Sequence, residues 1–513
     1  MQVTPFLRLR RRAWLVVAFA CAALAVVVGL NQRRALRPPS PRTIARPTIL
    51  DDDALMLYGD ARTAEATARE VRSLGVDWLR VNAAWSNIAP ASQSARRPPF
   101  DARDPAAYPA GVWAPLDRAV RAAAQNGLRV LIDIGFWAPR WAVARPVAPV
   151  ERQRWDISPS EYARFAEAVA RRYSGRYGGL PAAVGFTIWN EPNNGDFLLP
   201  QWRRDRGRWA VDSARSYREL MYAAYPAIKR VAPRSLVLVG ATFQAGTENP
   251  GSVASPVSPL RFLRELACVS KDLRPLRDGA CRGFRPLPGD GWSHHPYSPA
   301  GSPDHADPDP DHVDIAGLGR LTGLLDQLHA EGRTVNPMGV YVTEFGYETN
   351  PPDPTARVDP AAQARFLPEA ERLATSNPDV RSFAQFLLRD GPVRPGRTPG
   401  QRWSDVQSGL MYADATAKPA LTSFRYAFVV HRSGEGAIAW WGHVRPGAGP
   451  RTVRITVGAS NGSWRPLPGP GRPFQTDSHG YLAGATHADP TAAYRLEVRV
   501  DGMWRGGAPV RAP

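Results

Sequence analysis

The sequence predicts an α/β fold: a (β/α)8 TIM barrel with an antiparallel β-sandwich after it and a transmembrane helix before it. Apolar strand-like runs alternate eight times with amphipathic stretches between about residues 55 and 430. After about residue 433, runs alternate apolar with polar residues, and no helix-period segment intervenes. Near the N-terminus, an almost unbroken apolar run extends from Ala13 to Leu30.

Eight short runs are predicted to be the barrel strands. The sixth has the weakest pattern, because Trp292, Ser293 and His294 show no clear periodicity. Long loops rich in Pro and Asp after the second, fifth, sixth and seventh strands suit a substrate cleft on the C-terminal face. The predicted strands are Leu55–Tyr58, Val76–Val81, Arg129–Ile134, Val184–Trp189, Leu236–Val239, Gly291–His295, Val340–Thr343 and Ser382–Leu387. The predicted helices are Ala61–Leu74, Trp113–Gln125, Pro159–Tyr173, Ala214–Val231, Leu318–Glu331, Pro360–Ala374 and Lys418–Val430.

The last part of the chain, residues 432–513, is predicted to be a separate β-sandwich domain after a barrel domain of residues 50–431. Its strand candidates are Ala437–Val444, Arg451–Val457 and Ala493–Val500, which are divided by Gly- and Pro-rich turns. Four tryptophans there could stack on sugar rings, although such side chains more often fill a core or a domain seam. They are Trp440, Trp441, Trp464 and Trp504.

The N-terminal segment is predicted to be an uncleaved signal anchor. Residues 1–12 are basic, and the 18 apolar residues 13–30 would span about 27 Å as a helix, close to the thickness of a bilayer. The run continues into Arg33 and Arg34 without an A-x-A-like cleavage site, and residues 31–49 form a Pro- and Arg-rich linker. The basic flank before the run places the body of the protein outside the cell membrane. Secretion after signal cleavage is the alternative.

The strong positive charge is interpreted as a solvated surface that suits an acidic cell envelope. The chain carries 65 Lys and Arg against 47 Asp and Glu, a net charge of +18. Such a surface can attract nucleic acid, anionic lipid or an acidic polysaccharide. The arginines are scattered, and no RNP-like or zinc-ligand pattern accompanies them. We therefore expect no nucleic-acid partner.

Two further groups of residues bear on cysteine and metal chemistry. Cys268 and Cys281 could close a surface loop in an oxidising compartment, or they could remain free thiols. Three histidines lie near a run of aspartates, but their spacing is not diagnostic of a metal site, so we expect a solvated acidic loop and neither a metal nor a cofactor. These residues are His294, His305 and His312, with Asp304, Asp307, Asp309 and Asp311.

Two predicted strands each end in a glutamate. The run Val184-Gly-Phe-Thr-Ile-Trp-Asn-Glu-Pro-Asn193 places Glu191 at a strand end, where Pro192 stops the ladder. The run Val340-Tyr-Val-Thr-Glu-Phe-Gly346 places Glu344 in the same position 153 residues later. Two carboxyl groups that face one pocket at the C-terminal face of a barrel are what glycoside hydrolysis requires. The alternative is a chance pair of solvated strand ends.

These two motifs resemble the catalytic signatures of clan A glycoside hydrolases, and most of all those of family 39 and related cellulase-like barrels. The resemblance covers roughly residues 50 to 430 and extends to Leu79-Arg80-Val81, Trp85-Ser-Asn-Ile-Ala-Pro90 and His294-His295-Pro296-Tyr297. It departs at the eighth strand, Ser382-Phe-Ala-Gln-Phe386, where such enzymes usually place a tryptophan under the substrate. Phe386 or Trp403 could take that place.

The resemblance implies a retaining mechanism without a cofactor, in which the two carboxyl groups lie about 5–5.5 Å apart. Glu344 would be the ionised nucleophile, and Glu191 would be the acid that becomes a base once Glu344 is esterified. The two would titrate as a coupled pair. Around them, Asn190 would bind the sugar 2-hydroxyl, Arg80 and Tyr297 would donate to Glu344, His295 would line the floor, and Trp85, Trp137 and Trp141 would contact sugar. The alternatives are a structural ion pair for Arg80 and a core histidine for His295.

The sequence thus predicts a membrane-anchored, outward-facing retaining glycosidase that acts on a polysaccharide or oligosaccharide. One alternative is a catalytically silent barrel that binds envelope glycans. Another is a transglycosylase that uses the same two glutamates.

Overall fold

The computed structural model describes residues 46–144, 153–205, 207–298, 301–447, 449–459, 462–467 and 473–512. The predicted anchor, residues 13–30, and most of the linker lie outside the described residues. In the part of the chain that is described, no helix is both long enough and apolar enough to cross a bilayer.

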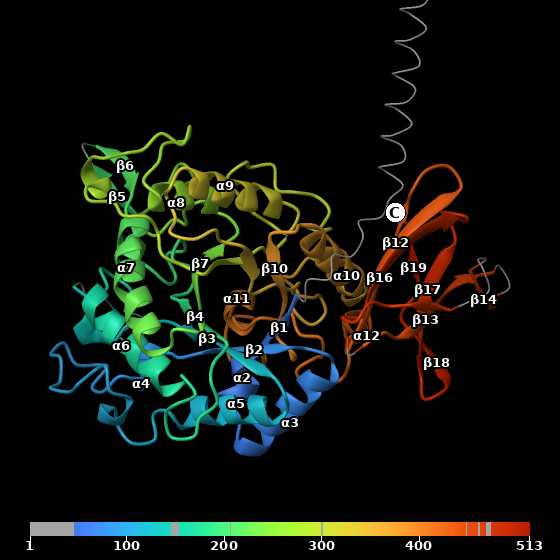
Figure 1. Cartoon of the computed structure of the whole chain (residues 1–513), viewed down its shortest axis with the longest axis horizontal. Helices are drawn as coiled ribbons and strands as arrows, with labels where there is room; N and C mark the ends of the chain where they lie inside the picture. The colour runs from blue at the N-terminus through green and yellow to red at the C-terminus, as the bar shows by residue number, and fades with distance from the viewer. Residues whose placement is uncertain are drawn as a thin grey trace, which may run out of the picture. The chain divides into compact units, whose positions relative to one another are not determined.

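Eight parallel strands form a closed barrel in the order β1, β2, β3, β4, β7, β8, β9, β10, with β10 pairing back onto β1. Because all eight strands run in parallel, their C-terminal ends meet at one face of the barrel, where barrel enzymes carry their active sites. Helices surround this barrel (Figure 1). The barrel strands are β1 (Thr48–Asp51), β2 (Trp78–Asn82), β3 (Arg129–Ile134), β4 (Gly185–Ile188), β7 (Leu236–Phe243), β8 (Gly291–His295), β9 (Val340–Val342) and β10 (Val380–Phe386).

The main helices begin with local signals and bury an apolar stripe against the barrel. In α6, for example, the side chain of Ser158 accepts the N–H of Glu161, Pro159 occupies the first turn, and Phe165 and Val169 are fully buried. The main helices are α3 (Ala61–Ser73), α5 (Ala114–Gln125), α6 (Pro159–Arg172), α7 (Ser213–Val231), α8 (Pro259–Leu266), α9 (Leu318–Ala330) and α10 (Pro360–Ser376). Shorter elements are α2 (Asp53–Met56), α4 (Trp85–Ile88), α11 (Pro399–Arg402), α12 (Pro419–Arg425), the 3-10 turns η1 (Pro105–Ala107), η2 (Arg140–Ala142) and η3 (Gly279–Cys281), and a hairpin of β5 (Trp202–Asp205) and β6 (Arg208–Val211).

The predicted barrel is confirmed, but its first predicted strand is wrong. Leu55–Tyr58 does not form a strand: residues 53–56 form α2, and the first strand is Thr48–Asp51. Asp52 decides this boundary, because its carboxylate caps α2 by accepting the N–H of Leu55. The correction moves three consecutive aspartates to the C-terminal end of a barrel strand.

The last predicted helix, Lys418–Val430, is right only in its first half. Helix α12 ends at Arg425, and the β-branched and aromatic residues that follow form β11 (Tyr426–Arg432). Because these residues are apolar, they extended the periodic pattern that predicted the helix. In the structure they pair with a strand of the C-terminal region.

The C-terminal residues form two antiparallel sheets, and they belong to a compact unit, Phe428–Val444 with Gly449–Pro513, that is distinct from the barrel unit. One sheet has the order β11, β12, β16, and the other has β14, β13, β17, β18, with β15 paired to β13 and β19 paired to β17. The guanidinium groups of Arg495 and Arg454 lie over the rings of Trp464 and Trp504, at 4.0 and 4.4 Å. One face of each ring is thereby occupied by an arginine. The strands are β12 (Ala437–Val444), β13 (Thr452–Gly458), β14 (Trp464–Pro466), β15 (Phe474–Gln475), β16 (Tyr481–His487), β17 (Ala493–Val500), β18 (Met503–Gly506) and β19 (Val510–Arg511).

Cys268 and Cys281 are joined by a disulfide, with their Cα atoms 5.5 Å apart. The bond closes a loop of 13 residues after α8. We expect replacement of both cysteines by serine to lower the free energy of unfolding by about 2–4 kcal/mol, because the unfolded chain regains the entropy of an open loop. Urea unfolding with and without a thiol reductant measures this. The reductant should destabilise the wild type and leave the double variant unchanged, and equal unfolding midpoints for the two proteins would contradict the expectation.

Candidate active site

A cavity of about 640 Å³ contains both glutamates predicted from the sequence. Glu191 follows β4, Glu344 follows β9, and both belong to its lining together with Arg80, Asn190 and Tyr297. The structure therefore brings five of the predicted site residues to one place, although they come from four different strand ends.

The backbone around Glu191 is bent to aim its side chain into the cavity. Trp189 and Glu191 have positive φ angles of +60° and +39°, which non-glycine residues adopt at a cost of about 1–3 kcal/mol each. The N–H of Glu191 donates to the carbonyl of Ala241 at 2.9 Å, at a register shift between Gly240 and Thr242 of β7. This irregularity in the neighbouring strand supplies the acceptor that holds the turn in place.

Glu344 accepts hydrogen bonds on both carboxylate oxygens. Arg80 Nη1 donates to Oε1 at 2.7 Å, and the hydroxyl of Tyr297 donates to Oε2 at 2.8 Å. Burial alone would raise the pKa of Glu344, but the charges of His295 and Arg80 and these hydrogen bonds outweigh it and lower the pKa. Glu344 is accordingly held as an anion. Burial, reinforced by the charge of Glu344, raises the pKa of Tyr297, which keeps its proton for donation.

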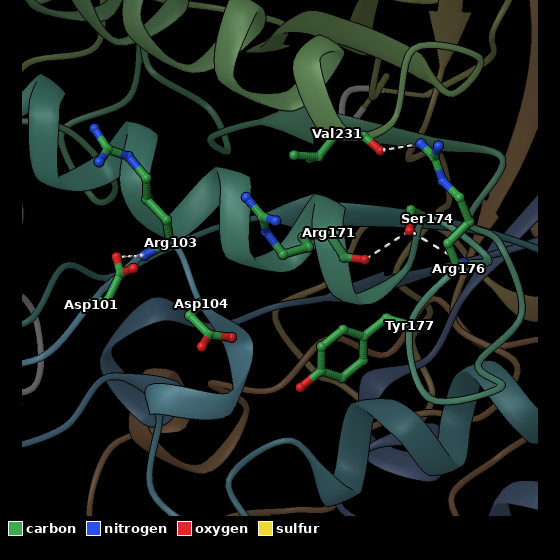
Figure 2. A pocket seen from close by; sticks show the side chains of 8 residues that line it. All are labelled: Asp101, Arg103, Asp104, Arg171, Ser174, Arg176, Tyr177 and Val231. Carbon is green, nitrogen blue, oxygen red and sulfur yellow. Dashed lines mark hydrogen bonds between the residues drawn. The ribbon is translucent and has the colours of Figure 1, made fainter.

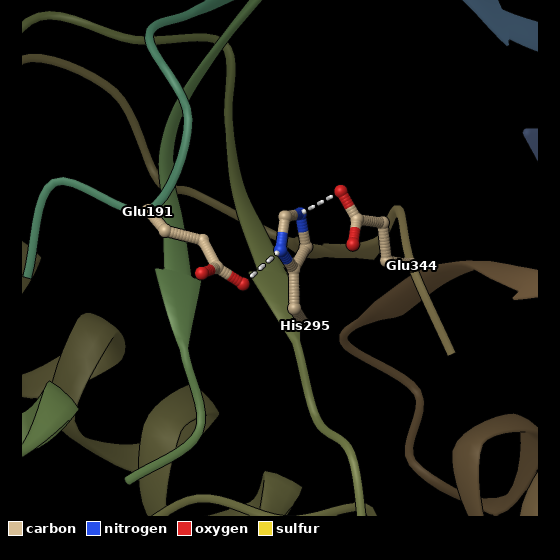
Figure 3. A group of neighbouring side chains, drawn as sticks. All are labelled: Glu191, His295 and Glu344. Carbon is tan, nitrogen blue, oxygen red and sulfur yellow. Dashed lines mark hydrogen bonds and ion pairs between the residues drawn. The ribbon is translucent and has the colours of Figure 1, made fainter. Parts of the chain in front are cut away.

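His295 lies between the two glutamates (Figure 3). Its Nδ1 is 3.0 Å from Glu191 Oε1, and its Nε2 is 3.5 Å from Glu344 Oε1. One nitrogen of His295 and one oxygen of each glutamate all lie within 4.8 Å of one another. The two carboxyl groups are thus close enough to act on the same sugar carbon. These three atoms are also a possible ligand set for a metal ion.

Asn190 is oriented by Arg80, whose Nη2 donates to Asn190 Oδ1 at 3.0 Å. Because the oxygen of the amide is engaged, its NH2 group is the part left to donate to a bound hydroxyl. Asn194 donates to Glu191 Oε2 at 2.9 Å. The other oxygen, Oε1, lies 3.0 Å from His295 Nδ1.

With this geometry established, the chain can be compared with known proteins. The sequence model of the family "Cellulase (glycosyl hydrolase family 5)" matches residues 46–314, which is more than half of the chain. The chain belongs to glycosyl hydrolase family 5. The matched range contains Arg80, Asn190, Glu191 and His295, while Glu344 lies beyond it. Among curated proteins, no sequence matches this family 5 chain.

Solved structures are also similar to the chain. A family 39 glycoside hydrolase from the gut symbiont Bacteroides cellulosilyticus WH2 is 16% identical with a TM-score of 0.50, over 86% of this chain and 81% of that one. A GH5_18 protein from Streptomyces cattleya in complex with GlcNAc is 16% identical with a TM-score of 0.44, over 74% and 79%. The β-glycosidase of Thermosphaera aggregans is 16% identical with a TM-score of 0.44, over 72% and 87%. The resemblance to clan A glycoside hydrolases is confirmed, and the family 5 chain has the fold and the family membership of a glycosidase.

Arg80 is surrounded by more carboxylates than it can neutralise. Its Nη1 also donates to Asp51 at 2.7 Å, and its Nη2 lies 3.6 Å from Asp133. Burial works against the charge of Arg80, but the charges of Glu344, Asp133 and Asp51 outweigh it and raise its pKa. Neither oxygen of Asp133 makes a hydrogen bond, and its side chain is fully buried, which raises its pKa to about 7.

Asp133 should make the stability of the family 5 chain depend on pH. Its pKa is about 7 in the folded state and 3.8 ordinarily, so between these values the folded state binds the additional proton. The free energy of unfolding should therefore fall as pH rises from about 4 to 7, by up to about 1.4 kcal/mol per pH unit, and level off above 7. In the variant Asp133→Asn, this contribution to the fall of the unfolding free energy with pH should be absent. Urea unfolding of both proteins at several pH values measures the difference, and parallel curves would refute the assignment.

The predicted tryptophans lie outside the cavity lining. Trp85 is 1% exposed and packs on Phe165, with ring centroids 5.5 Å apart, and Trp141 packs edge-on against Trp85 and donates to the carbonyl of Pro90. Trp137 is half-buried, donates to the carbonyl of Asp196 and stacks on Phe197, which does line the cavity. Aromatic lining comes instead from Phe136, Phe197, Phe243, Tyr297, Tyr347 and Phe386. Phe386 thus occupies the wall at the eighth strand, and Trp403 does not belong to the lining.

Sequence reasoning missed Asp51, Asp53, Asn82 and Asn194. Asp51, Asp53 and Asn82 line the cavity, because β1 ends at Asp51 and β2 ends at Asn82. The signal was available, since three consecutive acids after Thr48-Ile-Leu50 mark a strand end. Assigning the first strand to Leu55–Tyr58 concealed it.

The histidines considered as metal ligands are dispersed. His294 is buried between Thr242 and the carbonyl of Val313, and burial lowers its pKa to about 3. His305 is paired with Asp304 on the surface. His312 contacts the backbone of Gly246 and lies 3.2 Å from Asp307 and 3.6 Å from Asp309. In the described part of this loop, His294 and His305 thus lie apart from the two aspartates that contact His312.

A second cavity, of about 710 Å³, lies outside the barrel beside the C-terminal end of α6 (Figure 2). Its wall includes Asp101, Arg171 and Tyr177. The side chain of Asp101 accepts a backbone N–H, and Arg171 pairs with Glu167 at 2.8 Å. Its charged groups thus already have partners within the protein.

Proposed function

We propose that this chain is a retaining glycosidase that acts on a polysaccharide or oligosaccharide, with Glu344 as nucleophile and Glu191 as acid and base. The observation that supports this most directly is that one carboxylate oxygen of Glu191 and one of Glu344 lie within 4.8 Å of each other. Retaining glycosidases need about 5–5.5 Å for direct attack on the sugar, whereas inverting enzymes need about 6.5–9.5 Å to admit a water. The charge state of Glu344 also supports the proposal, because its lowered pKa keeps it an anion, as a nucleophile must be.

In the first step, a carboxylate oxygen of Glu344 forms a bond to the anomeric carbon while the glycosidic C–O bond breaks. The leaving oxygen takes the proton of Glu191, and the sugar remains as an ester of Glu344. The NH2 group of Asn190 would hold the 2-hydroxyl during this step, a contact that strengthens in the transition state. Arg80 and Tyr297 keep Glu344 ionised and aimed until it attacks.

In the second step, esterification has removed the charge of Glu344, so the proton affinity of Glu191 falls and Glu191 can act as a base. A water gives its proton to Glu191 and its oxygen to the anomeric carbon, and the ester bond to Glu344 breaks. The two displacements together restore the original anomeric configuration. His295, in contact with both carboxyl groups, can compensate the changes of charge between them.

The stereochemistry of the first product tests this proposal. Proton NMR during hydrolysis of an aryl glycoside should show the retained anomer first, with the other anomer appearing only by slow mutarotation. The inverted anomer as first product would refute a double displacement. The complete absence of turnover across a panel of aryl glycosides and polysaccharides would refute the enzymatic function.

We also propose that residues 13–30 anchor the enzyme in the cell membrane with the barrel outside. Support comes from the length of the apolar run, its basic flank and the missing cleavage site. Membrane fractionation tests the anchor, and protease treatment of intact cells tests the side. A barrel that remains in the soluble fraction after cell lysis would contradict the anchor.

A further inference from the structure

Three consecutive aspartates follow β1, and each has a different environment. The carboxylate of Asp51 is engaged by Arg80 at 2.7 Å. Asp52 caps α2 and also accepts the N–H groups of Leu388 and Arg389, both at 3.1 Å. These two side chains are therefore used within the fold. Asp53 lines the cavity that contains the two glutamates, and Arg80 bonds to Asp51 in preference to it.

The carboxylate of Asp53 is fixed from one side only. Asn82 donates its side-chain NH2 to Oδ2 at 2.6 Å and its backbone N–H to Oδ1 at 3.2 Å. Both donors belong to Asn82, the last residue of β2. The end of β2 thus holds a carboxylate that follows the neighbouring strand, β1. An ionised carboxylate can accept about four hydrogen bonds, so each oxygen of Asp53 keeps capacity for a ligand in the cavity.

We propose that Asp53, held by Asn82, is a substrate-binding residue that accepts hydrogen bonds from sugar hydroxyls in this cavity. The proposal rests on the proposed function, since it concerns the sugar placed beside Glu344. A carboxylate accepts and does not donate, so the group that it recognises must be a donor, and a hydroxyl is the donor that every sugar offers. A carboxylate or sulfate on the sugar would be repelled at this wall.

The hydroxyl in question lies beyond C2. Asn190 and Asp51 bond to different nitrogens of Arg80, Nη2 and Nη1, so the β1 wall with Asp53 and the β4 wall with Asn190 lie on different sides of this guanidinium. Because Asn190 is assigned the 2-hydroxyl, the ring hydroxyls that remain for Asp53 are those beyond C2. We assign it the hydroxyl at C3 or C4.

The test combines two enzymes with three substrates. The wild type and Asp53→Ala are assayed on an aryl glycoside that the wild type hydrolyses and on its 3-deoxy and 4-deoxy analogues. The wild type should hydrolyse one deoxy analogue about 10–100-fold more slowly in kcat/KM, the worth of a charge-assisted hydrogen bond. Asp53→Ala should lose this discrimination while hydrolysing that analogue at nearly the wild-type rate. Equal discrimination by both enzymes would overturn the proposal.

Asp60→Asn serves as the control, because Asp60 is an exposed carboxylate that caps α3 and asparagine caps equally well. It should retain the full discrimination. Calorimetric binding of neutral methyl hexosides and pentosides, with their 3-deoxy and 4-deoxy analogues, separates this proposal from the proposed function. If nothing is hydrolysed, a loss of binding selectivity in Asp53→Ala still supports the role of Asp53. Unchanged selectivity, or no binding of any sugar to the wild type, overturns it.

Discussion

Replacement of Glu344 by glutamine is expected to reduce kcat/KM by about 10⁴-fold or more, as the removal of a catalytic nucleophile does in other enzymes. Glutamine preserves the size of the side chain but cannot form the glycosyl ester. It also leaves Arg80 and Tyr297 donating to a neutral group, although Arg80 keeps Asp51 as an anionic partner. Steady-state assays on an aryl glycoside measure the loss, and a thermal melt verifies that the variant is folded.

Glu348→Gln is the matched control for this variant. Glu348 lies four residues farther along, belongs to the lining of the same cavity and undergoes the same chemical change. We expect its activity to stay within about tenfold of the wild type, because its charged neighbours are Asp353, Asp390 and Lys418 and not the two glutamates. A Glu344→Gln variant that keeps a tenth of the wild-type activity would exclude Glu344 as the nucleophile.

The variant Glu191→Gln should lose activity in a way that depends on the leaving group. For an alkyl or sugar leaving group, which needs a proton, we expect a loss of about 10²–10⁴-fold. For a dinitrophenyl glycoside, which departs as a stable anion, formation of the glycosyl ester should be nearly unaffected. Hydrolysis of that ester then becomes limiting, because Glu191 no longer accepts a proton from water.

Pre-steady-state kinetics on the dinitrophenyl substrate should accordingly show a burst of phenolate followed by slow turnover. Azide, which needs no base, should accelerate the slow phase and yield a glycosyl azide. Equal losses for both kinds of leaving group would assign the acid function to another residue, with His295 the nearest candidate.

The barrel could be predicted because buried parallel strands are continuous apolar runs. Arg129–Ile134 and Gly291–His295 were predicted with the bounds that the structure has. The first strand was missed because its apolar core, Thr48-Ile-Leu50, is shorter than the neighbouring Leu55–Tyr58. Apolar periodicity favours the longer run, whereas capping by Asp52 makes residues 53–56 helical.

The polar centre of the site was easier to predict than its walls. Strand ends fix Arg80, Asn190 and Glu344, and the barrel brings these ends together whatever the loops do. A tryptophan after a strand is different, because its direction depends on the loop. After β2 the chain enters α4 at once and buries Trp85 under α6, where it packs on Phe165. Loop conformation is a product of tertiary packing, and local sequence does not reveal it.

The direction of the barrel strands also decides how the enzyme would be presented on a support. The described chain enters β1 at the N-terminal end of the barrel, while the cavity opens where the strands finish. Arg46, where the described chain begins, therefore lies at the end of the barrel opposite the cavity. A covalent link to a support made at Arg46 would accordingly leave the cavity open to a polymer that approaches from solution.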